Sequence, residues 1–287
     1  MSNVIRKYYN FTMPELPEVR VVVKALNNTI LNKKITNLII YKPKIFKEFS
    51  PQYFISILRD KKIEKIDNIG KHIIFFLSEK LVLLSHLRME GKYRYYLNPP
   101  KEIDKHLVAR FVFSDNSELH FLDKRLFGTY MLRNLENYNK IPPISLLGPE
   151  PKDIDIEALF KKIKNSKMPI KTKLLDQSFV AGIGNIYADE ALFASRIHPL
   201  SKASNLSLEQ LKDIIKNANE IMEKSYELGG TTLFSYESLN KQEGKYQDFL
   251  NIHSDTIKKC KVCGQKTLKL KVNQRGTYVC PNCQKVY

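Results

Sequence analysis

The chain has 287 residues, a length that accommodates two domains with separate hydrophobic cores. It has no apolar run near the roughly 18 residues that a membrane-spanning helix needs, which excludes an integral membrane protein and favours a cytoplasmic one. The net charge of +17, together with 15 tyrosines and 15 phenylalanines, favours a polyanionic partner and nucleic acid above all, although a lysine-rich coding bias would produce part of that charge.

Residues 13–20, Met-Pro-Glu-Leu-Pro-Glu-Val-Arg, have the form of an internal start site, because an initiator methionine is normally removed when a small residue follows it. Removal would leave Pro14 as a secondary amine with a pKa of about 8, against roughly 10.4 for lysine, so more of it would be nucleophilic at neutral pH. Attack on a sugar C1′ would give a cationic iminium, with Glu15 and Glu18 as carboxyl groups for the proton transfers. In a purely structural interpretation, Pro14 kinks a linker, and Pro17 and Glu18 only begin a helix.

The first residues, Met1 to Thr12, bear directly on this hypothesis, because Pro14 is an amide nitrogen as long as they are attached. We therefore expect that Met13 is the true initiator or that the 1–12 extension is removed. Arg6 and Lys7 would suit a short targeting peptide, but the segment lacks the apolar run of a secretory signal.

A helix is predicted to start at Pro17 and to end near Asn32, because apolar residues recur there at helical spacing. From Lys34 to Leu132 the pattern changes to short runs rich in β-branched and aromatic residues. Eight strands are predicted, at 35–41, 62–69, 72–77, 81–86, 92–97, 108–113, 118–122 and 129–132. This succession indicates an antiparallel β-sandwich or barrel in an N-terminal domain at 13–134, flanked by helix.

The strand pattern stops after Asn134, and the proline-rich residues 135–151 predict a linker. Helices are predicted beyond it, the last with a capping box formed by Ser207 and Gln210, at 154–165, 172–176, 185–195 and 207–227. With the Gly-Gly-Thr-Thr segment at 229–232 they form a second, helical domain at 152–240. The predicted fold class is therefore α+β with two domains.

Three turns have the composition of nucleic-acid contacts. Residues 177–190 place glycines before a helix that begins near Asn185, where free backbone amides can hold a phosphate, although an isolated Gly-x-Gly more often serves close helix packing. Met89 lies in a turn between two predicted strands and suits a wedge in a base stack. Arg125 and Phe127, in another such turn, suit a bidentate contact with a base edge and a stacking partner. The structural alternative puts Met89 and Phe127 in the core and Arg125 in solvent.

All four cysteines lie in the last 28 residues, as Cys260-x2-Cys263 and Cys280-x2-Cys283. This spacing is typical of a four-cysteine zinc site in a reducing compartment and argues against a secreted disulfide protein. Because four thiolates leave no open position on the metal, we expect one structural Zn²⁺ in a zinc finger at 250–287, with no part in the chemistry.

Taken in order, these motifs resemble the formamidopyrimidine-DNA glycosylase (Fpg) family over residues 13–287. The opening Pro-Glu-Leu-Pro-Glu-Val, the loop Asp-x-Arg-x-Phe-Gly at 123–128, and 177–190, which is similar to the family's helix-two-turns-helix signature, carry the resemblance. It implies a catalytic centre made of Pro14, Glu15, Glu18, Lys71 and Arg275. It implies DNA contacts by Met89, Arg125, Phe127, Lys171 and Asn185, and candidate lesion contacts by Glu90, Thr231 and Thr232.

The resemblance implies a monomeric, bacterial-type glycosylase and AP lyase, associated with the nucleoid through DNA, that excises oxidised purines such as 8-oxoguanine and formamidopyrimidines from duplex DNA. Leu16, Arg125 and Phe127 favour this reaction over that of the similar endonuclease VIII branch, which removes oxidised pyrimidines. An inactive zinc-bearing protein that binds damaged DNA is a third possibility, which the 1–12 extension would favour. Residues 250–259 depart from the family's Tyr-Gly-Arg-x-Gly pattern, and the lysines at 258 and 259 are the expected electrostatic substitutes.

Overall fold

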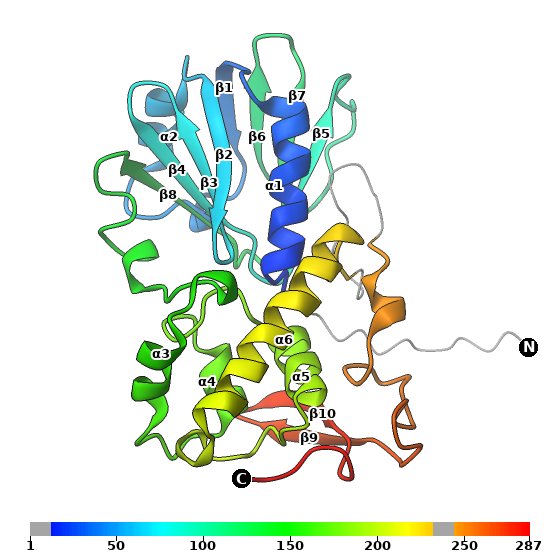
Figure 1. Cartoon of the computed structure of the whole chain (residues 1–287). Coiled ribbons are helices and arrows are strands. Elements are labelled where there is room, and N and C mark those ends of the chain that lie inside the picture. Colours follow the sequence, from blue (N-terminus) through cyan, green and yellow to red (C-terminus); the bar gives the residue numbers. More distant parts are fainter. Residues whose placement is uncertain (1–12, 232–243) are drawn as a thin grey trace, which may run out of the picture.

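The computed structural model describes residues 13–231 and 244–287 (Figure 1). The 1–12 extension and Thr232 lie outside the described residues. The first domain contains α1 (Leu16–Ile30), α2 (Pro51–Leu58), β1 (Ile35–Ile40), β2 (Ile63–Ile69), β3 (His72–Leu77), β4 (Leu81–His86), β5 (Lys92–Tyr96), β6 (Leu107–Phe113), β7 (Glu118–Leu122) and β8 (Thr129–Asn134). After it come α3 (Ile156–Ile163), α4 (Ile170–Leu175), α5 (Asn185–Ala194), α6 (Leu208–Glu227), β9 (Leu268–Val272) and β10 (Arg275–Val279). Single 3₁₀ turns lie at Pro43–Ile45, Ile144–Leu146, Pro151–Asp153, Ala203–Asn205 and Tyr246–Phe249.

The predicted N-terminal helix is present as α1. Pro17 lies in its first turn, where a missing N–H costs nothing, and the predicted apolar face is buried at Val19, Val22, Leu26 and Ile30. The helix ends two residues before the predicted Asn32, which adopts a left-handed φ of 65°. Helix α1 therefore has the expected start and buried face.

All eight predicted strands are present, and their ends differ from the prediction by at most two residues. They form two antiparallel sheets with the orders β1-β6-β7-β5 and β2-β3-β4-β8. The sheets share one core with α1, in which the ring of Phe121 packs edge-on against Tyr130 at 5.2 Å. The predicted antiparallel sandwich is confirmed.

Helix α2 was not predicted. Its start signal is nevertheless in the sequence, because the Ser50 hydroxyl accepts a hydrogen bond from the Tyr53 amide at 3.2 Å and Pro51 occupies the first helical position. Phe54 and Leu58 of this short helix are buried beneath the sandwich surface.

A second core lies among α3, α4, α5 and α6, and all four helices were predicted within two residues of their observed ends. Leu16, the first residue of α1, belongs to this core and not to that of the sandwich. Its amide donates to the carbonyl of Gly182, the residue where φ is +94° and where an added Cβ would lie 2.8 Å from Leu16. The start of α1 is thus built into the second domain.

Charged residues fasten the two domains beside α1, which runs between the sandwich and α6 (Figure 1). Arg20 on α1 pairs with Glu150 at 2.7 Å and also with Glu223 on α6. Glu150 in turn accepts the Gly70 amide, in the turn between β2 and β3, at 2.9 Å. These bonds hold the β2–β3 turn and the second domain against one another around the N-terminal end of α1.

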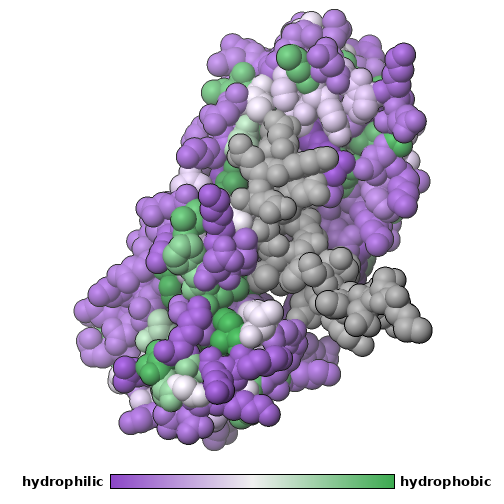
Figure 2. Space-filling view, turned by 90° about the vertical axis from the view of Figure 1, so that its right-hand side faces the viewer, coloured by the Kyte–Doolittle hydropathy of each residue, from purple (hydrophilic) through white to green (hydrophobic). Residues whose placement is uncertain are grey.

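The surface of the molecule is largely hydrophilic, in agreement with its high content of charged residues. Hydrophilic residues cover most of the face seen in Figure 2, on both lobes of the molecule. Among residues 13–231 and 244–287, no helix is both long and apolar enough to cross a membrane.

Candidate active site

Glu15 lies against the N-terminal end of α5. Its carboxylate accepts the Ile186 amide at 2.9 Å and the Tyr187 amide at 3.4 Å, and only 2% of the residue is exposed. Burial raises the pKa of the Glu15 carboxyl group from 4.5 to about 7, against the opposing effects of the Lys71 charge and the Ile186 amide. A carboxyl group with such a pKa can donate or accept a proton at neutral pH.

Gly184 makes this approach possible. A Cβ at position 184 would lie 2.2 Å from the Glu15 Cδ and 2.5 Å from its Oε1, so no side chain fits there. Close packing, the structural alternative for these glycines, is therefore part of their role, because it admits the carboxylate to the helix start.

Glu18 is as deeply buried as Glu15, but its carboxylate has other hydrogen-bond partners. Its Oε1 accepts the Tyr187 hydroxyl at 2.6 Å and both the amide and the hydroxyl of Thr231, at 2.9 and 3.0 Å, while its Oε2 accepts the Glu15 amide at 3.0 Å. Burial raises the pKa of the Glu18 carboxyl group, and the Thr231 amide opposes that shift. The residue ties α1 to α5 and to the segment after α6, and it does not line the cavity described next.

A cavity of about 180 Å³ opens beside Glu15. Its lining includes both neighbours of the buried Pro14, namely Met13 and Glu15, together with Lys71, Asn185 and Arg275. Most of the predicted catalytic centre is therefore gathered at one cavity. The lining also includes polar residues to which the sequence had assigned no role, namely His86, Arg88 and Gln177.

Lys71 is buried at the cavity, and its ammonium group donates to the Ile183 carbonyl at 2.9 Å. Burial lowers the pKa of this ammonium group, and the negative charge of Glu15 partly offsets that shift. Because the Ile183 carbonyl belongs to the glycine turn before α5, Lys71 also connects the β2–β3 turn to that loop.

Lys171 and Asn185 contact the β9–β10 hairpin, which carries the exposed Arg275. The fully buried Lys171 ammonium pairs with Asp189 at 2.6 Å and donates to the Thr277 hydroxyl at 2.8 Å. The Asn185 amide nitrogen donates to the Gly276 carbonyl at 2.9 Å, and its buried oxygen has no hydrogen-bond partner among the described residues. The two residues thus hold β10 in place, and their contact with a phosphate stays a prediction.

The structure brings Met89, Arg125 and Phe127 together from two loops. The Arg125 guanidinium lies 4.7 Å from the centre of the Phe127 ring, and its Nη1 is 3.4 Å from the Met89 sulfur. Phe127 is 45% exposed, which rules out the alternative that placed it in the core. The Met89 turn is set by His86, whose Nδ1 accepts the Arg88 amide at 3.0 Å.

The predicted lesion contacts are less closely grouped. Glu90 is half-buried in the turn that carries Met89. The amide and the hydroxyl of Thr231 both donate hydrogen bonds to Glu18. Thr232 lies outside the described residues. Their contacts with a lesion stay predictions.

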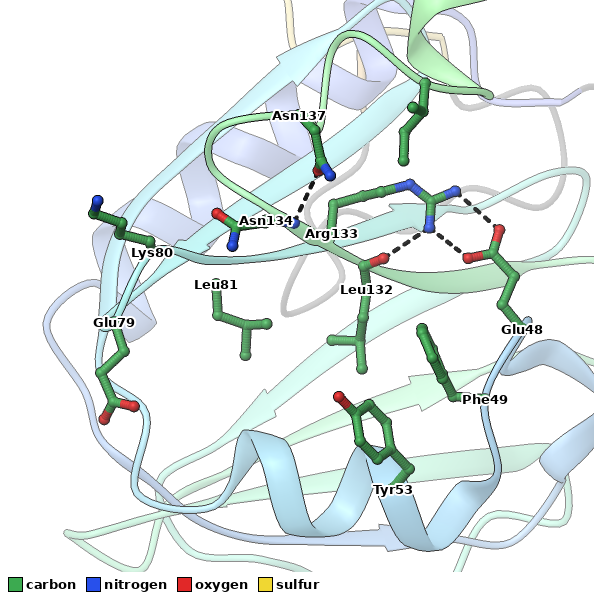
Figure 3. Close-up of a pocket in the computed structure, with 11 residues that line it drawn as sticks. Glu48, Phe49, Tyr53, Glu79, Lys80, Leu81, Leu132, Arg133, Asn134 and Asn137 are labelled. Carbon is green, nitrogen blue, oxygen red and sulfur yellow. Dashed lines mark hydrogen bonds and ion pairs between the residues drawn. The ribbon is translucent and has the colours of Figure 1, made fainter.

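A larger groove, of about 400 Å³, lies in the first domain and is lined by residues of α2, β4, β8 and the adjoining loops (Figure 3). Phe49 and Tyr53 stack at 4.8 Å along it, and the Arg133 guanidinium in its wall is already paired with Glu48 and the Pro142 carbonyl. None of the residues predicted for catalysis or DNA contact lines this groove. The smaller cavity at Glu15 is therefore the candidate active site.

Three family models match consecutive parts of this chain. Family models described as the formamidopyrimidine-DNA glycosylase N-terminal domain, its H2TH domain, and a zinc finger found in FPG and IleRS match residues 13–130, 147–237 and 258–286. A formamidopyrimidine-DNA glycosylase of Mycoplasmopsis pulmonis is 51% identical over 273 residues, covering 95% of this chain and 98% of that protein. The chain belongs to the formamidopyrimidine-DNA glycosylase family.

Solved structures of this family share the fold over nearly the whole chain. A complex of a Lactococcus lactis Fpg mutant with Fapy-dG-containing DNA superposes with a TM-score of 0.88 at 36% identity, covering 95% of this chain and 100% of that one. A complex of the wild-type Lactococcus lactis Fpg with DNA containing an oxidised pyrimidine has a TM-score of 0.86 at 35% identity, with coverages of 95% and 100%. The α+β fold with two domains and a zinc finger is thus the fold of the family.

The family's zinc finger is complete in this chain. The sulfurs of Cys260, Cys263, Cys280 and Cys283 all lie within 4.8 Å of one another, which suits a single tetrahedral ion. This confirms the predicted site for one structural Zn²⁺. The site lies at the base of the β9–β10 hairpin, whose first β10 residue, Arg275, reaches the cavity.

Proposed function

We propose that the protein is a bifunctional DNA glycosylase and AP lyase of base excision repair that removes oxidised purines from duplex DNA. The observation that supports this most is the Glu15 carboxyl group, which has a pKa of about 7 and lies beside Pro14 at the wall of a cavity. Lys71, Arg88 and Arg275 line the same cavity, and their side chains suit a phosphodiester held across its mouth.

In the proposed reaction the Pro14 nitrogen forms a bond to C1′ of the damaged nucleotide, the bond from C1′ to the base breaks, and the proton that the Pro14 nitrogen loses neutralises the departing base. Glu15, whose raised pKa of about 7 keeps a fraction of it protonated at neutral pH, donates its proton to the sugar ring oxygen as the ring opens. The iminium that results draws electrons from C2′, so loss of a C2′ proton breaks the 3′ carbon–oxygen bond, and a second elimination breaks the 5′ one. Lys71 and Arg275 stabilise the negative charge of the flanking phosphate.

This chemistry requires Pro14 to carry a free amine, so the proposed active form lacks the 1–12 extension. The family match supports this form, because it begins at residue 13. In the same proposal Met89, Arg125 and Phe127 fill the space that the extruded nucleotide leaves. Asn185, which borders the cavity, contacts a phosphate beside it, the buried Lys171 adds its positive charge without direct contact, and Thr231 and Thr232 contribute to the wall around the base.

Borohydride trapping tests the proposal. Protein that begins at Pro14 is mixed with duplex DNA that contains 8-oxoguanine, and a covalent adduct at Pro14, found by peptide mass mapping, is the expected result. The full 287-residue chain is the matched control and should bind the same DNA without being trapped. Strand cleavage by a form whose Pro14 nitrogen is blocked would refute the mechanism.

The same assay separates the alternatives. Duplexes with thymine glycol test the endonuclease VIII reaction, and the proposal fails if thymine glycol is excised and 8-oxoguanine is not. Because the Lactococcus lactis Fpg is seen in complex with DNA that contains an oxidised pyrimidine, 8-oxoguanine and thymine glycol have to be compared in the same experiment. Tight binding of lesion DNA with no trapped species from the Pro14 form would support the inactive damage-binding protein instead.

A further inference from the structure

The loop between β7 and β8 is organised by one buried carboxylate, that of Asp123. Its Oδ1 accepts the amides of Arg125 and Leu126, at 2.9 and 3.0 Å, and its Oδ2 accepts the amide of Gly128 at 2.7 Å. Only 2% of Asp123 is exposed, and its own amide donates to the His106 carbonyl at 3.0 Å. A carboxylate that accepts several backbone amides fixes the conformation of the turn around it.

This loop has little freedom to change. Leu126 is held at a φ of +56°, which is unfavourable for a leucine and needs support from the surrounding bonds. A Cβ on Gly128 would lie 2.9 Å from the Phe121 ring and 3.1 Å from Asp123 Oδ2, so the loop packs tightly on the sandwich. The side chains of Arg125 and Phe127, on either side of Leu126, are exposed in the same turn.

We propose that Asp123 is a positioning residue that sets how strictly the protein discriminates the base opposite the lesion. The inference rests on the proposed function, in which Arg125 fills the space that the extruded nucleotide leaves, and it assigns Arg125 to the base that remains there in the opposite strand. Arg125 reads a base edge only if its guanidinium arrives in one orientation, and in the structure it is already stacked on Phe127 beside Met89. Without the Asp123 carboxylate the Arg125 amide loses its fixed acceptor, so the guanidinium samples other orientations and the contact loses its selectivity.

The test is the rate of excision of one lesion placed opposite each of the four bases, in single-turnover experiments with protein that begins at Pro14. In Asp123→Ala the ratio between the fastest and slowest opposite base is expected to fall about tenfold towards one, since a bidentate base contact contributes discrimination of about this size. The matched control is Asp155→Ala. Asp155 caps α3 by accepting the amides of Glu157 and Ala158, at 3.0 and 3.1 Å, so this variant also loses a carboxylate that holds backbone amides but should keep the ratio.

A second arm asks whether Asp123 acts through Arg125. In an Arg125→Ala background the ratio should already be low, and adding Asp123→Ala should not lower it further. If Asp123→Ala does not fold, Asp123→Glu replaces it, because the glutamate keeps a carboxylate at the buried position while its extra methylene group moves both oxygens away from the Arg125 amide, so the ratio should fall in this variant as well. An unchanged ratio in the folded variant, or a loss that persists without Arg125, overturns the inference.

Failure of the proposed function has a different signature. If the unmutated protein that begins at Pro14 yields no borohydride adduct, the enzyme assignment fails, and the inference about discrimination falls with it. If the adduct forms but Arg125→Ala leaves the ratio unchanged, Arg125 does not read the opposite base, and Asp123 cannot act through it. Only an adduct together with a ratio that depends on both residues supports the inference.

Discussion

The buried carboxyl group of Glu15 leads to a prediction about stability. Its pKa is raised from 4.5 to about 7, so between these values the folded protein holds a proton that the unfolded chain has lost. The free energy of unfolding therefore falls as the pH rises through this window. At about 1.36 kcal/mol per pH unit, ionising Glu15 costs the folded state about 3 kcal/mol above pH 7 and nothing well below pH 4.5.

The substitution Glu15→Gln keeps the shape of the side chain and removes the ionisation. We expect the free energy of unfolding of the variant, relative to wild type, to rise by about 2 kcal/mol between about pH 5.5 and about pH 8.5. Any constant effect of the new amide on the Ile186 and Tyr187 amides cancels, because the comparison is between two pH values. Urea unfolding curves of the zinc-loaded proteins measure this difference.

Glu136→Gln is the control for the substitution itself, because it makes the same exchange at a side chain that is 72% exposed. The Glu15→Gln variant should also lose at least about 100-fold in the rate of base excision, because it has no proton to donate. A stability difference for Glu15→Gln that stays constant, or that shrinks as the pH rises, would refute the raised pKa and with it the assignment of Glu15 as the acid.

Three further predictions concern the frame of the site. Gly184→Ala should lower excision at least about 100-fold in single-turnover assays while the protein stays folded, because the new methyl group displaces Glu15. Removal of zinc with a chelator should weaken binding to abasic-site DNA at least about tenfold, because it releases the hairpin that carries Arg275. Added zinc should restore binding in the wild-type protein but not in Cys263→Ser. Arg20→Ala should lower the free energy of unfolding by about 1–3 kcal/mol, because it leaves the nearly buried Glu150 without a charge partner. Lys65→Ala removes an exposed ion pair and should cost less than about 1 kcal/mol.

The secondary structure of this chain was predictable because its signals are local. The eight strands and α1 follow from the spacing of apolar residues within each segment, and the zinc site follows from the spacing of two cysteine pairs. Helix α2 escaped because eight residues carry only two turns of the helical period, and its cap, Ser50 before Pro51, was the only other sign.

The sequence motifs named Glu15, Lys71 and Arg275, which line the candidate site, but they did not give its geometry. The bond from the Ile186 amide to Glu15 joins residues 171 positions apart, and no local pattern specifies such a contact. The same holds for Asp123, which the motif at 123–128 contains but whose three amide bonds depend on how the β7–β8 turn closes. Lys171 shows the converse, because a lysine in sequence suggests a surface cation, whereas the folded chain buries it beside Asp189.

The two carboxyl groups at the start of α1 show why geometry has to decide between residues that sequence treats alike. Glu15 and Glu18 are separated by one turn, and either would serve as a proton donor. In the fold, Glu18 accepts hydrogen bonds from three residues, including the Glu15 amide, and has no face on the cavity, whereas Glu15 borders it. A proton carried by Glu18 would have to leave a fully bonded carboxylate to reach a sugar, so we assign the proton transfer to Glu15 and the placing of Glu15 to Glu18.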